Sequence, residues 1–199
     1  MAEGTRAGRY VALLRGINLG GKNKVPMATL SAMFVDLGCT DVETYIQSGN
    51  VVYTATNQVA GRVARRIPEM IHEQLGLKVP VITRTVAELR EAVENNPFLK
   101  EGADEATLHL VFLGDEPTEQ QVAVLDPERS PGDRSAVRGR EVYLFCPNGL
   151  ARTKLTNAYF DSQLKTVSTV RNWRTVLALV HMAEGGITST GLPRPVSLR

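Results

Sequence analysis

The chain has 199 residues, of which 43% are hydrophobic and 22% are charged, and its formal net charge is +2. A chain of this length buries roughly 70% of its unfolded surface, so its core needs neither a disulfide nor a metal ion. So small a net charge does not by itself predict a nucleic-acid partner, and no stretch approaches the roughly 20 apolar residues of a membrane span. We therefore expect a cytoplasmic protein with no membrane partner, folded as one large domain or two small ones.

The first elements predict a strand, a helix and a hairpin. An apolar strand at 10–14 leads into a glycine-rich loop at 15–25. A helix with apolar residues at helical spacing then runs from Pro26 to Gly38. Alternating residues at 42–46 and the apolar run at 51–54 predict two strands that turn at Ser48-Gly49-Asn50.

A second helix and a fourth strand complete this first unit. The helix carries an apolar stripe from about residue 57 to Gly76, with a kink or a break expected at Pro68. Residues 79–83 predict the fourth strand. A connecting helix then begins at Thr85, where Thr85 and Glu88 have the spacing of a capping box.

The second half repeats the same order without residue-level similarity. The predicted elements are strand 108–113, helix 117–125, hairpin strands 134–137 and 141–146, helix 153–164, strand 166–168 and a terminal helix from Val170 to Gly185. We expect an α+β fold of two consecutive ferredoxin-like βαββαβ plaits, with a connecting helix and a C-terminal helix. Right-handed crossovers give each unit the strand order 4-1-3-2, with all neighbours antiparallel. One mixed sheet that merges both units is the alternative.

Domain boundaries follow from this order. The expected parts are the first plait at 9–84, the connecting helix and linker at 85–106, the second plait with its terminal helix at 107–185, and a flexible tail at 186–199. The tail is rich in Gly, Pro, Ser and Thr, which is typical of a mobile segment.

Polar residues of the first unit gather at one end of its predicted sheet. The loop after the first strand and the hairpin turn lie at that end, and together they contain Arg15, Asn18, Lys22, Asn23, Lys24, Gln47, Ser48 and Asn50. No acidic residue lies between Arg15 and Met33, and the helix from Pro26 adds the positive end of its dipole. The composition predicts an anion site, although neither GxxxxGK[ST] nor GxGxxG occurs. A long turn with solvated lysines is the structural alternative.

A second polar cluster is expected in the second unit. The loop after its third strand and the residues after its fourth strand contain Arg152, Lys154, Asn157, Arg171, Asn172 and Trp173. A cation near a helix start is disfavoured by the helix dipole, so Arg171 indicates a ligand or a carboxylate partner there. Trp173 has helical spacing with Leu177, which favours a core position over a stacking surface.

Several classes of chemistry lack support in the sequence. Cys39 and Cys146 belong to no metal or redox spacing, and we expect both to be buried free thiols. The three histidines lie outside the loop clusters, and no Ser–His–Asp order or metal-ligand spacing occurs. The first and third strands offer one aromatic each, Tyr10 and Tyr53, and lack the basic-Gly-aromatic start of RNA-recognition domains, so we expect no base-stacking platform. We therefore expect no cofactor.

The chain resembles a widespread bacterial family at four segments. These are Leu14–Met27, Tyr45–Val52, Arg152–Asn157 and Thr169–Trp173. They are similar to the motifs of the domain-of-unknown-function family 1697 (DUF1697). The resemblance covers about Tyr10 to Ala183 and implies a duplicated α/β plait. It implies no activity, cofactor or catalytic residue.

Three functional hypotheses follow from these residues. The first is a binding module for a phosphorylated or otherwise anionic ligand, either a small molecule or a nucleic acid. Lys24, Lys154, Arg15 and Arg171 would supply charge, and Asn18, Gln47, Asn50 and Asn172 would orient the ligand. The second is an enzyme acting on such a ligand, with Tyr45 or Tyr159 as proton donor. The third is a protein-interaction module whose loops are purely structural. The residues leave turnover and oligomeric state open.

Overall fold

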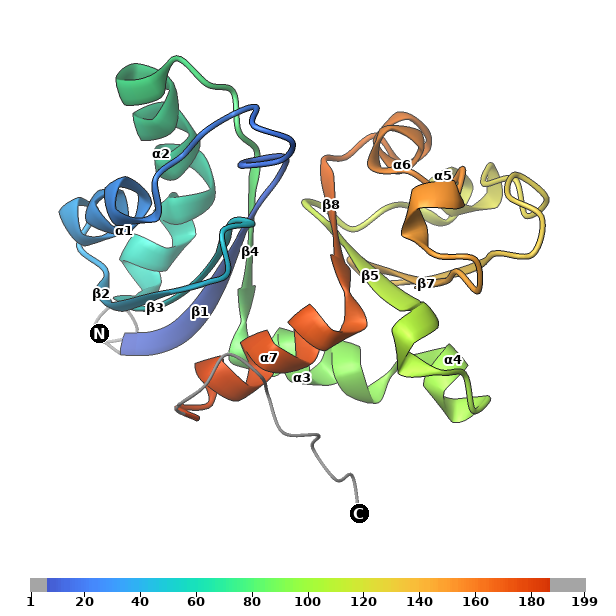
Figure 1. Ribbon diagram of the computed structural model, residues 1–199. Coiled ribbons are helices and arrows are strands. Elements are labelled where there is room, and N and C mark those ends of the chain that lie inside the picture. The colour runs from blue at the N-terminus through green and yellow to red at the C-terminus, as the bar shows by residue number, and fades with distance from the viewer. Residues whose placement is uncertain (1–6, 187–199) are drawn as a thin grey trace. The chain divides into compact units, whose positions relative to one another are not determined.

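The structure is a computed structural model and describes residues 7–186 (Figure 1). These residues fall into two compact units, one of residues 7–90 with 178–186 and the other of residues 91–177. Apart from Gly186, the tail predicted at 186–199 lies outside the described residues.

The first unit contains a four-stranded antiparallel sheet. Its elements are β1 (Ala7–Leu14), α1 (Met27–Asp36), β2 (Thr40–Tyr45), β3 (Asn50–Thr56), α2 (Asn57–Leu75) and β4 (Val81–Thr85). The strand order is β2-β3-β1-β4, which is the order 4-1-3-2 that the sequence predicted. Leu13 of β1 is paired with Asn50 of β3, so the end of β1 lies beside the start of β3.

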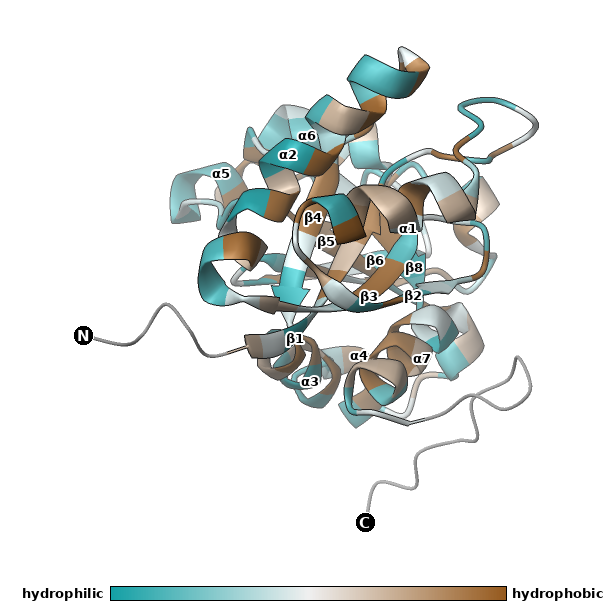
Figure 2. Ribbon diagram, turned by 90° about the vertical axis from the view of Figure 1, so that its left-hand side faces the viewer, coloured by the Kyte–Doolittle hydropathy of each residue, from teal (hydrophilic) through white to brown (hydrophobic). Residues whose placement is uncertain are grey.

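Helices α1 and α2 cover one face of this sheet (Figure 1). Alternate strand residues such as Leu14, Val51 and Tyr53 pack against apolar side chains of both helices. In α2 hydrophilic and hydrophobic bands alternate along the helix, and its buried stripe includes Val63 and Ile67 (Figure 2). Each fully buried aliphatic side chain contributes about 1.5–3 kcal/mol. This packing holds the loops that leave the sheet in fixed positions.

Of the kink or break expected at Pro68, the break is absent, because α2 continues without interruption from Asn57 to Leu75. Proline removes only one backbone hydrogen bond, and the helix has strong ends. The Thr56 hydroxyl accepts a hydrogen bond from the Val59 N–H, and Gly76 ends the helix with φ of 69°.

Two short helices lead from the first sheet to the second. They are α3 (Val86–Glu94) and α4 (Pro97–Lys100). The predicted capping box is present, because the Thr85 N–H donates to Glu88 Oε2 at 2.7 Å and the Glu88 N–H donates to Thr85 Oγ1 at 3.1 Å.

The second unit contains its own four-stranded antiparallel sheet. The elements from here to the C-terminal helix are the 3₁₀ turn Glu105–Thr107, β5 (Leu108–Leu113), α5 (Glu119–Ala123), β6 (Arg134–Arg138), β7 (Glu141–Phe145), the 3₁₀ turn Leu150–Arg152, α6 (Asn157–Leu164), β8 (Ser168–Asn172) and α7 (Trp173–Ala183). The strand order β6-β7-β5-β8 repeats that of the first sheet. Val111, Leu113 and Leu144 pack with Phe160 and Leu164 of α6.

Three predicted boundaries are wrong, and one is the start of the terminal helix, which was expected at Val170 but lies at Trp173 because Val170 belongs to β8. The helix expected from Thr153 begins at Asn157, because Thr156 is its cap and its hydroxyl accepts from the Tyr159 N–H at 3.2 Å. The last strand, expected at 166–168, is β8 at Ser168–Asn172. Its residues pair with β5 along their whole length, and this non-local pairing decides where the strand ends.

Both cysteines are buried free thiols, with Cys39 2% and Cys146 0% exposed. Burial disfavours the thiolate and raises the pKa of each thiol to about 11. We therefore expect both thiols to stay protonated at pH 8 and to react far more slowly with a disulfide reagent than free cysteine does. Absorbance during labelling would measure this, with a urea-unfolded sample as control. Native labelling as fast as unfolded labelling would contradict the prediction.

Candidate functional site

The loop between β1 and α1 forms a small hairpin of its own. The Asn18 N–H donates to the Asn23 carbonyl at 3.0 Å, and the Lys22 N–H donates to the Leu19 carbonyl at 3.0 Å. Gly20 and Gly21 lie between them with φ of 55° and 78°, as a type I′ turn requires. The two glycines therefore allow the chain to reverse direction in a tight turn, and this turn is exposed to solvent.

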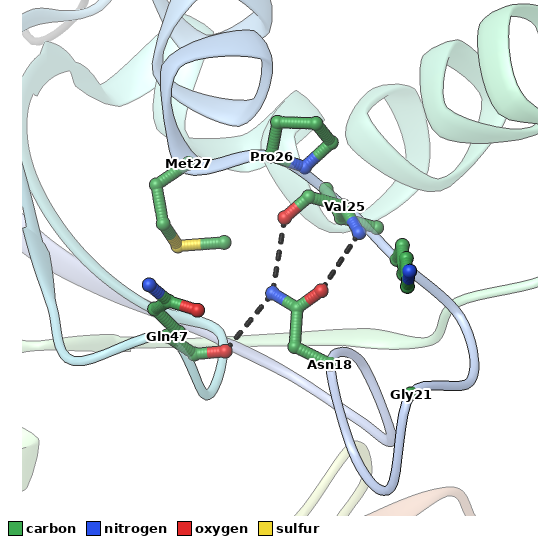
Figure 3. Close-up of a pocket in the computed structure, with 7 residues that line it drawn as sticks. Asn18, Gly21, Val25, Pro26, Met27 and Gln47 are labelled. Carbon is green, nitrogen blue, oxygen red and sulfur yellow. Dashed lines mark hydrogen bonds between the residues drawn. The ribbon is translucent and has the colours of Figure 1, made fainter.

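The Asn18 side chain joins this loop to the β2–β3 turn. Its Oδ1 accepts from the Val25 N–H at 2.9 Å, and its Nδ2 donates to the Val25 and Gln47 carbonyls, each at 3.0 Å (Figure 3). The two segments that the predicted topology brought to one end of the sheet are thus in direct contact. Because its amide is engaged by the backbone, Asn18 positions the loop and does not offer that amide to a ligand.

The β2–β3 turn is held by Asn50, which is 0% exposed. Its Nδ2 donates to the Tyr45 carbonyl at 3.2 Å and to Ser48 Oγ at 2.9 Å. The Gly49 carbonyl accepts from the Leu14 N–H at 2.7 Å, which fixes the turn to the end of β1. Ser48 and Asn50, both predicted as ligand-binding, therefore hold the turn together.

A pocket of about 440 Å³ opens beside this junction. It is lined by Asn18, Gly21, Lys24, Val25, Pro26, Met27 and Gln47. Gly21 and Val25 lie on one side of it, Met27 and Gln47 lie on the other, and the Asn18 amide lies between them (Figure 3). Three of the predicted site residues, Asn18, Lys24 and Gln47, line the same pocket.

The surroundings of the pocket are electropositive. Lys22 and Lys24 are exposed, and within residues 7–186 neither side chain has an ion pair or a hydrogen bond. Helix α1 begins at Met27 with no acidic residue in its first turn, and Pro26 provides no side-chain cap. Its first N–H groups therefore lack a capping partner from that position. Arg15 lies at the base of the loop, where its backbone N–H donates to the Pro80 carbonyl at 3.0 Å.

The second predicted cluster does not form as expected. Ser168 Oγ, at the start of β8, donates to the Asn157 carbonyl at 3.3 Å. Arg171 and Asn172 lie at the other end of that strand, where Asn172 is paired with His109. Grouping Asn157 with these two residues was wrong, because α6 starts late and its first turn packs beside the start of β8.

Arg171 and its neighbours have structural roles. The Arg171 Nη1 donates to Thr169 Oγ1 and to the Val170 carbonyl, each at 2.8 Å, and burial lowers the pKa of this guanidinium to about 10. Asn172 Oδ1 caps α7 by accepting from the Thr175 N–H at 2.8 Å. Trp173 is 0% exposed, so its indole is a core side chain and forms no open stacking surface.

Arg152 and Lys154 lie exposed on the loop before α6. The Lys154 backbone holds this loop to its neighbour, since its N–H donates to Ser130 Oγ at 3.0 Å and its carbonyl accepts from Arg129 Nε at 3.1 Å. The Arg129 guanidinium also lies 4.2 Å from the centre of the Tyr159 ring. The sequence did not single out Arg129, because no motif or periodicity marks its loop.

No histidine is among the described residues that line the pocket. His72 lies in α2, His181 lies in α7, and burial in β5 lowers the pKa of His109. Across the described part of the chain, no three His, Cys, Asp or Glu side chains are grouped so that they could hold a metal ion. None of the described helices is both long enough and apolar enough to cross a membrane.

Two four-stranded antiparallel sheets, each covered by helices on one face, place the chain among α+β proteins. The family model described as protein of unknown function (DUF1697) matches residues 8–143, and the chain belongs to this family. No curated protein matches the sequence.

A solved structure supports the fold. The conserved bacterial protein SP0830 from Streptococcus pneumoniae has a similar structure, with a TM-score of 0.65 and 24% sequence identity. The match covers 89% of this chain and 99% of that protein.

Proposed function

We propose that the first unit binds an anionic, phosphate-bearing ligand in the pocket between the β1–α1 loop and the β2–β3 turn. One observation carries the proposal: Lys24 lines a pocket of about 440 Å³ at the uncapped start of α1, and no partner within residues 7–186 neutralises it. A phosphate oxygen would receive a charge-assisted hydrogen bond from this lysine and further bonds from open backbone N–H groups.

The remaining loop residues divide into two roles in this proposal. Asn18, Ser48 and Asn50 hold the two segments in place through the hydrogen bonds described above. Lys22, exposed near the tip of the loop, adds long-range attraction for an anion. A rigid cradle of this kind reduces the entropy lost when the ligand binds.

Binding without turnover is the activity best supported by the lining. The seven residues around the pocket include no carboxylate, imidazole, thiol or phenol that would transfer a proton. A phosphorylated small molecule suits a pocket of this size, and a nucleic acid is the larger partner with the same chemistry.

The repeated strand order supports a finer description of the fold within this proposal. We describe the two sheets with their helices as two ferredoxin-like plaits, at 9–84 and 107–185, joined by a connecting segment at 85–106. The end of α7, from residue 178, belongs to the first compact unit. We place the protein in the cytoplasm, where phosphorylated metabolites are abundant and buried free thiols such as Cys39 remain reduced.

We expect Lys24→Ala to weaken the binding of inorganic phosphate by about tenfold, because one charge-assisted hydrogen bond is worth about 1.5–3 kcal/mol. Isothermal titration calorimetry at low salt would measure this. Added sodium chloride should weaken binding to the unchanged protein, since the lysine is exposed to screening.

Lys100→Ala is the matched control, because Lys100 is an exposed lysine at the end of α4 in the other unit. It removes the same charge and should leave phosphate binding unchanged. Equal losses in the two variants would show that only the total charge of the protein matters, and the proposed site would be wrong.

A further inference from the structure

The pocket combines two chemistries at its two ends. One end of the pocket, the loop end, is formed by Gly21 and Val25 of the β1–α1 loop. Lys24 belongs to this end because it immediately precedes Val25 in the chain. Met27 and Gln47 form the opposite, turn end, where their side chains face each other (Figure 3). We infer that the ligand is a nucleoside phosphate, with its phosphate at the loop end and its base at the turn end. This inference rests on the proposed function.

The turn end has apolar surface that a bare phosphate would not use. Met27 is half-buried and packs against the core, while Pro26 is exposed at the pocket. A polarizable thioether makes favourable contacts with an aromatic ring. The pocket volume of about 440 Å³ also lies in the range of about 300–1,000 Å³ that is typical of sites for drug-sized ligands.

Two exposed aliphatic residues are next in the chain to residues that line the pocket. Leu19 is 62% exposed and Ile46 is 55% exposed. Leu19 follows Asn18 and Ile46 precedes Gln47, and those two neighbours are joined by the 3.0 Å hydrogen bond between the segments. Both aliphatic residues are therefore within one residue of the junction, on opposite segments, and in this inference Leu19 adds apolar contact to the bound base.

Gln47 provides the recognition group for that base. Its backbone carbonyl is used by Asn18, but within residues 7–186 its exposed side-chain amide has no hydrogen-bond partner. A carboxamide presents one donor and one acceptor side by side, which matches the adjacent donor and acceptor on the edge of a nucleobase. The arrangement predicts a preference among bases and not only an attraction for phosphate.

Calorimetry with the full chain would test this by comparing inorganic phosphate, ribose 5-phosphate and the 5′-monophosphates of adenosine, guanosine, cytidine and uridine. We expect one nucleotide to bind at least about tenfold more tightly than ribose 5-phosphate. Gln47→Met keeps the side-chain length but removes both hydrogen-bonding groups, and it should abolish the difference in affinity between that nucleotide and ribose 5-phosphate.

A second pair of variants tests whether Leu19 contributes to nucleotide binding. Leu19→Ser should weaken nucleotide binding, whereas Val35→Ser should not, because Val35 is a similarly exposed aliphatic residue, 56% exposed, on α1. Thermal unfolding of each variant would confirm that the fold is retained.

The outcomes separate this inference from the proposed function. If ribose 5-phosphate bound as tightly as every nucleotide, the base would have no site, and the inference would be overturned while phosphate binding stood. If Gln47→Met weakened the binding of every probe equally, Gln47 would not distinguish one base from another. If no probe bound, the proposed function would fail and the inference with it.

Discussion

Replacing Gly49 with alanine should lower the free energy of unfolding by about 3 kcal/mol. Gly49 has φ of 76°, a conformation that costs an L-residue roughly 1–2 kcal/mol. An alanine Cβ at this position would also lie 2.7 Å from Leu14 Cβ and 3.1 Å from Ile17 Cδ1. Relieving such overpacking costs a further 1–3 kcal/mol or so. Because this turn forms one wall of the pocket, phosphate affinity should fall as well.

Gly21→Ala measures the cost of the backbone conformation alone, without the steric clash that Gly49→Ala adds. Gly21 has φ of 78°, close to that of Gly49, but no atom lies within 4 Å of the position its Cβ would take. We expect a loss of only about 1–2 kcal/mol for this variant. Urea unfolding followed by circular dichroism would measure the free energy of unfolding of both glycine variants. Equal losses would mean that the contact with Leu14 and Ile17 relaxes without cost, contrary to the prediction.

Asn18→Asp should lower the free energy of unfolding by about 3 kcal/mol at pH 7, although the two side chains have the same shape. The substitution removes two hydrogen bonds to the Val25 and Gln47 carbonyls, worth about 1 kcal/mol each. It also places a carboxylate oxygen about where Nδ2 lies, 3.0 Å from each of those carbonyl oxygens. Repulsion between these oxygens adds the rest.

The loss should depend on pH in a defined direction. In the folded variant, the carbonyl oxygens favour the protonated acid, so the pKa of the introduced carboxyl lies above its unfolded value of about 3.9. The folded state then binds more protons than the unfolded state between these two pKa values. Relative to the unchanged protein, the variant should therefore be least destabilised below about pH 4 and lose stability as pH rises through the folded pKa.

Urea unfolding from pH 3.5 to 8 would measure this dependence. Asn148→Asp is the control, because Asn148 is an exposed turn residue and the charge change is the same. It should show no such trend. A loss for Asn18→Asp that stayed constant across this pH range would mean that the amide does not donate to the two carbonyls.

Much of the fold could be predicted because it depends on local patterns. The alternation in β3, the stripe of α2 and the capping box of Thr85 and Glu88 each arise from residues close together in sequence. The strand order then follows from the handedness of the crossovers. Details set by non-local pairing were missed, as the position of β8 shows.

The candidate site, like the fold, could be predicted from the sequence only in part. The sequence alone was enough to place the β1–α1 loop beside the β2–β3 turn, since a glycine-rich cationic segment and a hairpin turn lie at one end of a known topology. The ligand roles of Lys22, Lys24 and Gln47 remain predictions. Lys24 and Gln47 line the pocket, and Lys22 is exposed on the same loop as Lys24.

Only the tertiary structure decided which polar groups are used internally. Asn18 and Asn50 satisfy backbone groups, Arg171 bonds to its own strand, and Trp173 lies in the core. The physical reason is that an amide or a guanidinium has the same donors whether it faces a carbonyl of the chain or a ligand. Which of the two it meets depends on distances between segments remote in sequence, and these exist only in the folded chain.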